Sequence, residues 1–385
     1  MRKSVVKILD KIIQNYINAN LNTDLHALLL KKSPFPEVSM HEIVQQIKGK
    51  QVALKKFPFL LKDGILFPPQ LNLEQSSSEK TAAYKSGLLK GEKFIDLTAG
   101  FGIDAYYLSE NFNQVTLIEQ NPDLLEIVRS NWHVLGKKAT FINQKLESFL
   151  EKNKEVFDVI YLDPARRDSN KNKVFLLEDL SPDILAIQEK LLSSATQVVI
   201  KLSPLIDLKY LASVLPAIFR IDIIAVKNDV KEIVVFLSNE KIKNISCNCI
   251  NLESDDPVFK FIFGDEENAF AEYGEPEKYI YIPNNAILKA GTFNLISQKM
   301  GLKKLHSNSH IYTSHSWIYN FPGRIFEMEI IDAKKIQKKS QYNIITKNYP
   351  LKPEEIKKKY SIKDGGEKYL IFTQSKKGKI ILKSV

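Results

Sequence analysis

The sequence predicts an α/β fold built around a mostly parallel, doubly wound sheet. Apolar runs suited to buried strands alternate with helical segments between residues 93 and 237. The first of these runs ends in a glycine-containing loop that opens a helix, and the last two are joined by a short polar link, which indicates a hairpin. These observations predict seven strands with a terminal antiparallel pair: 93–97, 114–119, 139–143, 157–162, 197–202, 219–226 and 232–237.

The first 70 residues are expected to form a helical N-terminal cap without catalytic groups. Phe-Pro segments at 57–59 and 67–69 end this region as a linker, and a serine between 76 and 78 is expected to cap the next helix. Apolar side chains recur at helical spacing at Val5, Ile8, Leu9, Ile12, Ile13, Tyr16, Ile43, Val44 and Ile47.

The loop after the first strand has the features of a nucleoside-cofactor site. Asp96 ends the strand, Gly100 and Gly102 follow, and a helix is predicted from Ile103. The glycines lack a Cβ, so the backbone can approach a ligand closely and adopt positive φ. Glu119 ends the next strand, where an acid could bind ribose hydroxyls.

Two cofactor classes use such a layout. Residues 100–105 match the G-x-G-x-x-A pattern of nicotinamide dinucleotide sites. Asp96 counts against that class, because a carboxylate at the strand end would repel a pyrophosphate. A nucleoside cofactor with an amine and no phosphate fits better.

A second loop, Asp-Pro-Ala-Arg-Arg at 163–167, follows a buried strand and has the residue types of a catalytic loop. At this point the chain resembles class I S-adenosylmethionine-dependent methyltransferases, through residues 96–102, Glu119 and residues 163–166. It is more narrowly similar to bacterial methyltransferases with a THUMP-like C-terminal domain, through residues 74–79, 348–351 and 363–366.

The resemblance implies a Rossmann-like class I methyltransferase sheet followed by small α+β modules. We expect a helical region at 1–70, a methyltransferase domain at 71–250, a ferredoxin-like segment at 251–315 and a basic THUMP-like domain at 316–385. Within the last two, a strand is expected in 278–286 and a helix near 290–300. A helix opened by Pro353 is expected to end at Gly365 and Gly366.

The resemblance also implies roles in binding S-adenosylmethionine. Glu119 should accept both ribose hydroxyls, and Asp96 should face the amino group, with turn capping or an ordinary strand-end acid as the alternatives. Gln144 should meet the adenine edge, unless the register places Lys145 there. The expected cofactor-binding set is Asp96, Thr98, Ala99, Gly100, Gly102, Glu119, Gln120 and Gln144.

The expected catalytic residues are Asp163, Pro164 and Arg166. Asp163 should orient the nucleophile or accept its proton. Related enzymes that methylate nitrogen place an aromatic ring in this loop, and its absence here counts against that chemistry. Arg166 and Arg167 could clamp phosphate or pair with surface acids at 178 and 179. Lys201 and Ser203 are further substrate candidates.

The net charge of +10 lies entirely in the C-terminal tail. Residues 331–385 contain 15 Lys and 5 Asp or Glu, so the basic and acidic side chains of residues 1–330 are equal in number. Such a tail attracts a phosphate backbone, although a solvated lysine-rich surface is the alternative. The THUMP-like resemblance favours RNA, as tRNA or rRNA.

Cysteine and hydropathy patterns limit the remaining possibilities. Cys247 and Cys249 are expected to be reduced strand residues, remote from the site, which disfavours cysteine-dependent carbon methylation. Neither they nor the histidines have metal-ligand spacing, so no metal is expected. No apolar run approaches the roughly 18 residues of a membrane span, and no signal peptide is recognisable, which predicts a cytoplasmic protein.

The expected function is therefore methylation of structured RNA with S-adenosylmethionine as cofactor. A protein or small-molecule methyltransferase would use the same core. A non-catalytic RNA-binding protein could also retain this fold, and a nicotinamide oxidoreductase is the most distant alternative. The sequence leaves the methylated atom and the oligomeric state open.

Overall fold

The computed structural model describes residues 7–166, 176–240 and 242–385, so the predictions for Val5, Arg167 and the Arg166 side chain lie outside the described parts. The chain divides into two compact units. The first comprises Met1–Phe219 with Val234–Ile242, and the second comprises Arg220–Ile233 with Lys243–Val385. The predicted four-domain boundaries stay predictions.

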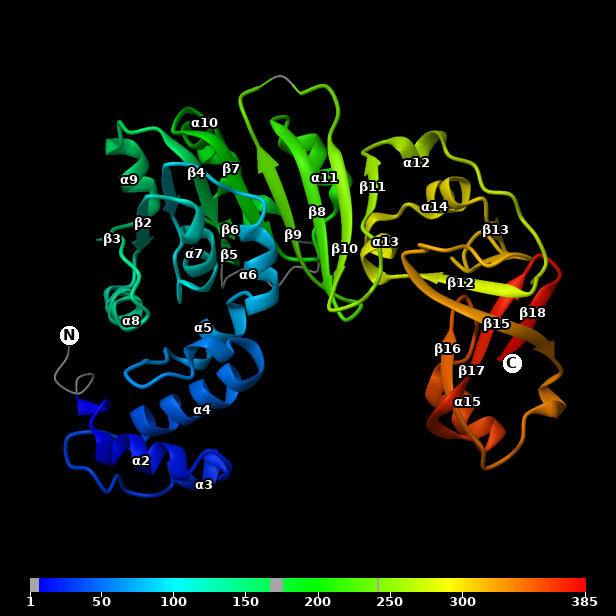
Figure 1. Cartoon of the computed structure of the whole chain (residues 1–385), viewed down its shortest axis with the longest axis horizontal. Helices are drawn as coiled ribbons and strands as arrows, with labels where there is room; N and C mark the ends of the chain where they lie inside the picture. Colours follow the sequence, from blue (N-terminus) through cyan, green and yellow to red (C-terminus); the bar gives the residue numbers. More distant parts are fainter. Residues whose placement is uncertain (1–6, 167–175, 241) are drawn as a thin grey trace. The chain divides into compact units, whose positions relative to one another are not determined.

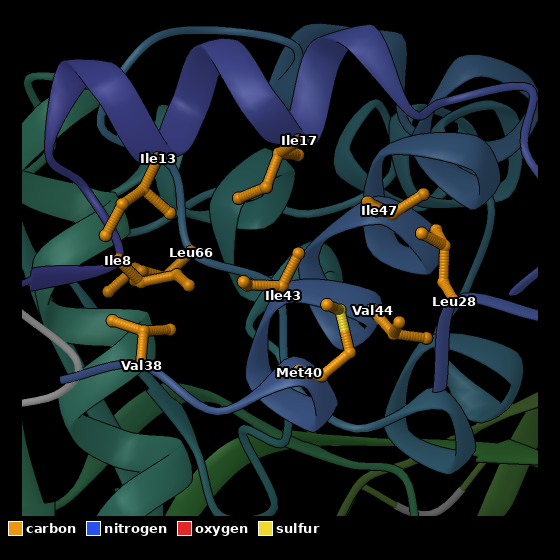
Figure 2. Packing of buried hydrophobic residues seen from close by; sticks show 10 residues of the cluster. All are labelled: Ile8, Ile13, Ile17, Leu28, Val38, Met40, Ile43, Val44, Ile47 and Leu66. Atoms are coloured by element: carbon orange, nitrogen blue, oxygen red, sulfur yellow. The ribbon is translucent and has the colours of Figure 1, made fainter. Parts of the chain in front are cut away.

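The N-terminal region of the first unit is helical, as predicted. It contains α2 (Lys11–Ala19), α3 (Leu25–Leu29) and α4 (Met40–Lys56), each with a side-chain N-cap. Figure 2 shows Ile17 of α2 pointing toward Ile43 of α4. Ile12 lies in α2, as its spacing predicts, but its side chain is 70% exposed because it projects from a different face of the helix than the buried Ile13 and Ile17.

The linker after α4 holds this region to the rest of the first unit. It contains η1 (Pro58–Leu60), α5 (Gln70–Gln75) and α6 (Glu79–Ser86). Its Leu66 backbone N–H and C=O both bond to the buried side chain of Asn131, at 2.8 Å each. The predicted serine cap of α6 is Ser78, whose Oγ accepts from the Thr81 N–H.

The first unit contains the parallel sheet that the alternating pattern predicts (Figure 1). Its strand order is β9-β7-β4-β1-β2-β3, where β9 is Asp229–Leu237, and β7, β4, β1, β2 and β3 run parallel. The parallel strands are β1 (Lys93–Asp96), β2 (Gln114–Glu119), β3 (Thr140–Asn143), β4 (Phe157–Leu162) and β7 (Ala195–Leu202). The connecting helices are α7 (Ile103–Leu108), η2 (Ser109–Asn111), α8 (Pro122–Val134), α9 (Leu146–Lys152), α10 (Ile184–Ser193) and α11 (Leu208–Val214).

This arrangement brings the ends of several strands together. Asp96 is in register with Leu117 of β2 and Tyr161 of β4. Because the strands are parallel, the loops that follow them emerge at one edge of the sheet. The sequence did not predict the short pair after β4, in which β5 (Ala165–Arg166) runs antiparallel to β6 (Leu180–Ser181), preceded by η3 (Leu177–Asp179).

The predicted terminal hairpin is β8 (Ile218–Val226) and β9 (Asp229–Leu237). Its loop is shorter than the five residues expected. Only Lys227 and Asn228 separate the strands, and both have positive φ, as a type I′ turn requires. All seven predicted strands are therefore present.

The second unit contains two strands that follow the expected hairpin. β10 (Ser246–Leu252) pairs parallel with β8, and β11 (Phe259–Ile262) pairs antiparallel with β10. Cys247 and Cys249 are free, buried residues of β10, which confirms their prediction as reduced strand residues.

A second sheet of the same unit has the order β13-β14-β12-β15-β18-β17-β16. The strand and helix expected near 278–300 are present as β12, α13 and α14. The elements are α12 (Asp265–Asn268), β12 (Tyr279–Pro283), α13 (Asn285–Ala290), α14 (Phe293–Met300), β13 (Lys303–Lys304), β14 (Tyr312–Ser314), β15 (Gly323–Ile331), η4 (Ala333–Lys335), β16 (Gln341–Thr346), α15 (Pro353–Tyr360), β17 (Lys363–Ser375) and β18 (Gly378–Ser384).

The predicted end of α15 was wrong. The helix ends at Ser361, which adopts the left-handed conformation with φ 52°. Gly365 and Gly366 instead lie in β17, where the pairing register with β16 shifts. A Cβ on Gly366 would lie 3.2 Å from that of Gln341, so glycine permits the close approach of the two strands. In all the described parts of the chain, the helices are too short or too polar to cross a membrane.

Candidate functional site

A cavity of about 310 Å³ lies in the first unit, where the loops after β1, β2, β3 and β4 meet. The segment between α5 and α6 forms another part of its wall. The wall is acidic: among its described lining residues there is no Lys or Arg, whereas five are carboxylates, namely Asp96, Asp104, Glu119, Glu147 and Asp163.

The loop after β1 is fixed by its own polar groups. The Asp96 side chain is buried and accepts from the Thr98 N–H at 2.9 Å. The Thr98 hydroxyl in turn accepts from the Asp163 N–H at 2.6 Å. These bonds join the ends of β1 and β4, and Asp96, Thr98, Ala99 and Asp163 all line the cavity.

The two glycines of this loop serve different needs. Both have positive φ, which disfavours other residues. A Cβ on Gly102 would also lie 2.9 Å from Val128 and 3.1 Å from Trp132, so this glycine lets α8 pack against the start of α7. A Cβ on Gly100 would approach nothing more closely than 3.7 Å.

Glu119 braces the same loop from the end of β2. Its carboxylate accepts from the Gly100 N–H at 3.0 Å and from the Asn121 N–H at 2.8 Å. One bond falls on each oxygen. Because a carboxylate oxygen can accept about two hydrogen bonds, each retains capacity for a ligand hydroxyl.

The residues that follow β2 and β3 also line the cavity. Gln120 and Gln144 line it, as does Glu147, which no sequence pattern had marked as a site residue. Lys145, the alternative to Gln144, is exposed and is not among the lining residues. Ile118 and Leu124 supply apolar surface to the same wall.

The loop after β4 places Asp163 at the cavity. Its side chain is 32% exposed, and one oxygen lies 2.5 Å from the Lys201 ammonium. Pro164 is buried behind the wall, and Ala165 lines the cavity. Ser203 is exposed, outside the lining, and its hydroxyl accepts from the Leu205 N–H.

A buried charge cluster adjoins the cavity. Ser77, Asp104 and Tyr161 line the cavity, and Lys85 and Lys201 contact them from outside the lining. Lys85 lies 2.9 Å from one oxygen of Asp104, and Lys201 lies 3.7 Å from the other. That second oxygen also accepts from Ser77 at 2.7 Å and from Tyr161 at 2.9 Å. Lys85 is only 1% exposed, so its charge depends on these partners.

The cluster separates the carboxyl pKa values. Burial opposes the charged form of Asp104, but Lys85 and Lys201 hold its pKa at about 2. Burial raises the pKa of Asp96 well above its ordinary range, and the carboxylates of Asp104, Asp163 and Glu119 add to this effect. Burial also raises the pKa of Asp163, with Asp104 contributing, against the lowering effect of Lys201.

Sequence reasoning missed most of this cluster. Lys85 occupies an ordinary position in a short helix, and Asp104 looks like a first-turn acid that favours a helix N-terminus. Neither position carries a local signal of burial. The serine segment at 76–78 was expected to cap the next helix, with a place beside the cofactor as the alternative; Ser77 joins the cluster and lines the cavity.

The described residues include no group of three or more His, Cys, Asp or Glu side chains arranged to hold a metal ion. The cysteines are outside the cavity lining. Burial raises the pKa of Cys247 to about 12, with a contribution from Asp222. This thiol is accordingly protonated and a poor nucleophile at neutral pH.

Three family models match parts of the chain. The model described as conserved hypothetical protein 95 matches residues 79–202, which contain the cavity loops. A ferredoxin-like domain model matches residues 279–322, and a THUMP domain-like model matches residues 323–383.

Among solved structures, the chain is similar over its whole length to a "putative methyltransferase" from Porphyromonas gingivalis W83. The two are 29% identical, with a TM-score of 0.85, over 99% of this chain and 98% of the other.

Curated relatives match a smaller part. An uncharacterized RNA methyltransferase of Mycoplasma mobile is 24% identical over 47% of this chain and 54% of its own length. The ribosomal RNA small subunit methyltransferase J of Psychrobacter arcticus is 30% identical over 35% of this chain and 58% of its own. The chain thus spans about half the length of the curated relatives it matches.

The structural match covers the whole chain, and the family model over residues 79–202 covers the parallel strands β1, β2, β3, β4 and β7. The chain therefore has the fold of class I methyltransferases, and it carries a THUMP-like C-terminal domain at residues 323–383.

Proposed function

We propose that this protein uses S-adenosylmethionine to methylate structured RNA, either tRNA or rRNA, in the cytoplasm. The observation that carries the proposal is the acidic cavity at the ends of the parallel strands. Asp104 and Asp163 pair with buried lysines, whereas the lining carboxylates of Asp96, Glu119 and Glu147 stand outside those ion pairs. With no Lys or Arg among the described lining residues, these three suit a cationic ligand and disfavour a pyrophosphate. The volume of about 310 Å³ lies at the lower end of the range for small-molecule sites.

The residues of the cavity fit this cofactor. Asp96 would face its ammonium group, and the free acceptor capacity of Glu119 would take the ribose hydroxyls. The backbone from Thr98 to Gly102 would follow the ligand closely, and Gln120 and Gln144 would lie beside its adenine base. When bound, the cofactor supplies an electrophilic methyl group on a sulfonium.

Asp163 is the proposed catalytic residue, supported by Pro164 in the same loop. One Asp163 oxygen faces Lys201, and the other retains capacity to accept from an N–H or O–H of the target. Such a bond would hold the nucleophile in line with the methyl group, which is the main requirement of this chemistry. The roles expected for Arg166 and Arg167 remain proposals.

Two observations support RNA as the substrate. The curated relatives include RNA methyltransferases, one of them named for small-subunit ribosomal RNA. The whole excess of positive charge lies in residues 331–385, which include most of the THUMP-like match. Clustered lysines bind phosphate backbones in a salt-dependent way.

The test is transfer of labelled methyl groups from S-adenosylmethionine into tRNA, rRNA and protein fractions from cells that lack this gene. Wild type is compared with Asp163→Ala and with Asp63→Ala, an exposed acid outside the cavity lining. We expect labelling of one RNA fraction, a rate lower by about 10²-fold or more in Asp163→Ala, and a near wild-type rate in Asp63→Ala.

Each other outcome points elsewhere. Label in protein alone would rule out RNA as the substrate. Cofactor binding without transfer to any fraction would instead favour a small-molecule substrate or a non-catalytic RNA-binding protein.

A further inference from the structure

The hydroxyl of Ser77 lies at the centre of the buried charge cluster. It donates to Asp104 at 2.7 Å and accepts from Lys85 and Lys201 at 3.1 Å each. One donated and two accepted bonds use the full capacity of a hydroxyl. The positions of the two ammonium groups are therefore defined by a residue that itself lines the cavity.

Lys201 connects this cluster to the proposed catalytic carboxylate. Its Nζ lies 2.5 Å from an Asp163 oxygen, 3.1 Å from Ser77 and 3.7 Å from Asp104. The Lys201 side chain is 9% exposed, whereas that of Asp163 is 32% exposed. A buried, multiply bonded cation thus faces a carboxylate that is partly open to the cavity.

Asp163 has one further anchor, which acts on its backbone. The Thr98 hydroxyl accepts from the Asp163 N–H, so the loop is fixed independently of the side chain. The side-chain direction depends on a different contact. Among the side-chain bonds and ion pairs that the described residues make with the Asp163 carboxylate, the Lys201 ion pair is the one that can set this direction.

We propose that Lys201 is a positioning residue that fixes the Asp163 carboxylate toward the cavity, and that Ser77 and Asp104 hold Lys201 in place for this task. Lys201 acts through Asp163 and does not itself contact the reacting atoms. The catalytic consequence of this inference rests on the proposed function, whereas its structural consequence does not.

Crystal structures of Lys201→Met and Lys201→Arg give the first test, because they require no activity. In Lys201→Met we expect the Asp163 side chain to leave its position while the Thr98 bond to the Asp163 N–H persists. Lys201→Arg, which keeps the charge, should restore the position at least in part. An unmoved Asp163 side chain in Lys201→Met would overturn the proposal.

A charge-balanced double variant serves as the control for effects on folding. Lys201→Met removes a buried cation and leaves Asp163 unpaired, so we expect it to lower stability by itself. The double variant Lys201→Met with Asp163→Asn removes one charge of each sign. Recovery of thermal stability in the double variant supports the direct pairing of the two residues, and additive losses contradict it.

Kinetics then separate positioning from general structural damage. For Lys201→Met we expect kcat to fall by about 10²-fold while the cofactor Kd stays within about twofold. Loss of the cation should also raise the pKa of Asp163, so the acidic limb of the kcat profile should move to higher pH.

A double-mutant cycle completes the test. In the Asp163→Asn background, Lys201→Met should cause little further loss of kcat, because the group it positions has already been changed. A full, additive loss would mean that Lys201 acts independently of Asp163. If wild type transfers no methyl group, the proposed function fails, and the crystal structures still decide the positioning role.

Discussion

The two units of the chain use lysine in opposite ways. At the cavity of the first unit, Lys85 and Lys201 are buried and held by named partners at 2.5 to 3.7 Å. In the second unit, Lys376, Lys377 and Lys379 are exposed around the turn between β17 and β18. They project from a module whose core is apolar, with Ile356, Leu370 and Phe372 fully buried.

The difference shows two distinct tasks for one side chain. A buried ammonium in a low dielectric interacts strongly with a few atoms and so fixes their positions. An exposed ammonium contributes to a field that acts over about 10 Å and is screened by salt. The buried lysines of the first unit therefore act through fixed positions, and the exposed lysines of the tail act through their summed charge.

The largest expected effect comes from breaking the buried cluster. Asp104→Asn leaves Lys85 and Lys201 without their shared counter-charge, which should lower the unfolding free energy by about 3–5 kcal/mol. Asp364, whose side chain is 68% exposed, is an ion-pair partner of Lys357. Asp364→Asn should lower the unfolding free energy by under about 1 kcal/mol. Equal losses would contradict the contrast between the two units.

Urea unfolding can measure this difference within each unit. The chain has two tryptophans, Trp132 in the first unit and Trp317 in the second. In a Trp317→Phe background, the buried Trp132 reports the first unit alone. The Trp317 signal, obtained by difference from wild type, reports the second unit.

The stability effect of Asp104→Asn should also depend on pH. The folded-state pKa of Asp104, at about 2, lies below the roughly 3.9 of an unfolded chain. Its ionisation therefore stabilises the fold above about pH 4, and this contribution is lost as the pH falls toward 2. The stability difference between wild type and Asp104→Asn should shrink over that interval.

A smaller effect is expected from neutralising the tail. Changing Lys376, Lys377 and Lys379 together to Gln should weaken RNA binding on the order of tenfold, similarly for different RNA sequences. The slope of log K against log salt should fall by about 0.9 for each phosphate that the variant no longer neutralises. The matched control changes three exposed lysines of the first unit to Gln: Lys90, Lys152 and Lys154.

Equal weakening by the two triple variants would mean that total charge, and not its place in the tail, decides RNA binding. Fluorescence anisotropy with a labelled RNA at several salt concentrations makes this distinction.

The smallest expected effect concerns Asp96. Its raised pKa in the free protein means that an ammonium group bound beside it favours the charged form. At pH values where Asp96 is protonated in the free protein, cofactor binding should then release up to about one proton, and affinity should rise with pH until the pKa of the free protein is passed.

Calorimetry in two buffers with different ionisation enthalpies measures the released protons. Asp96→Asn should abolish the release. Proton uptake, or the same release in wild type and variant, would count against the proposed contact between Asp96 and the amine.

The sequence predicted the parts of this protein that depend on local pattern. The seven strands are predicted by apolar runs. The glycine loop is predicted by residues 96–102, because its pattern lies within one short, continuous segment. The short loop at Lys227 and Asn228 was misjudged because strand ends carry weaker signals than strand centres.

The charge cluster was beyond such reasoning. Its five members come from five separate elements or loops, and Lys201 meets Ser77 across 124 positions of sequence. Burial of Lys85 depends on how α6 packs against α7, which no local pattern encodes. Gly365 and Gly366 misled the prediction for a related reason, because these glycines serve strand pairing and not a helix end.

The two hydrogen bonds between Leu66 and Asn131 connect the linker to α8, a helix that packs beside the cavity loop. Asn131 lies on α8, as do Val128 and Trp132, which contact the space beside Gly102. Without the linker, the buried amide of Asn131 loses both partners, and α8, which packs beside Gly102, loses an anchor. A fragment expressed from residue 70 onward should therefore be less stable than the full chain, because it lacks these two bonds.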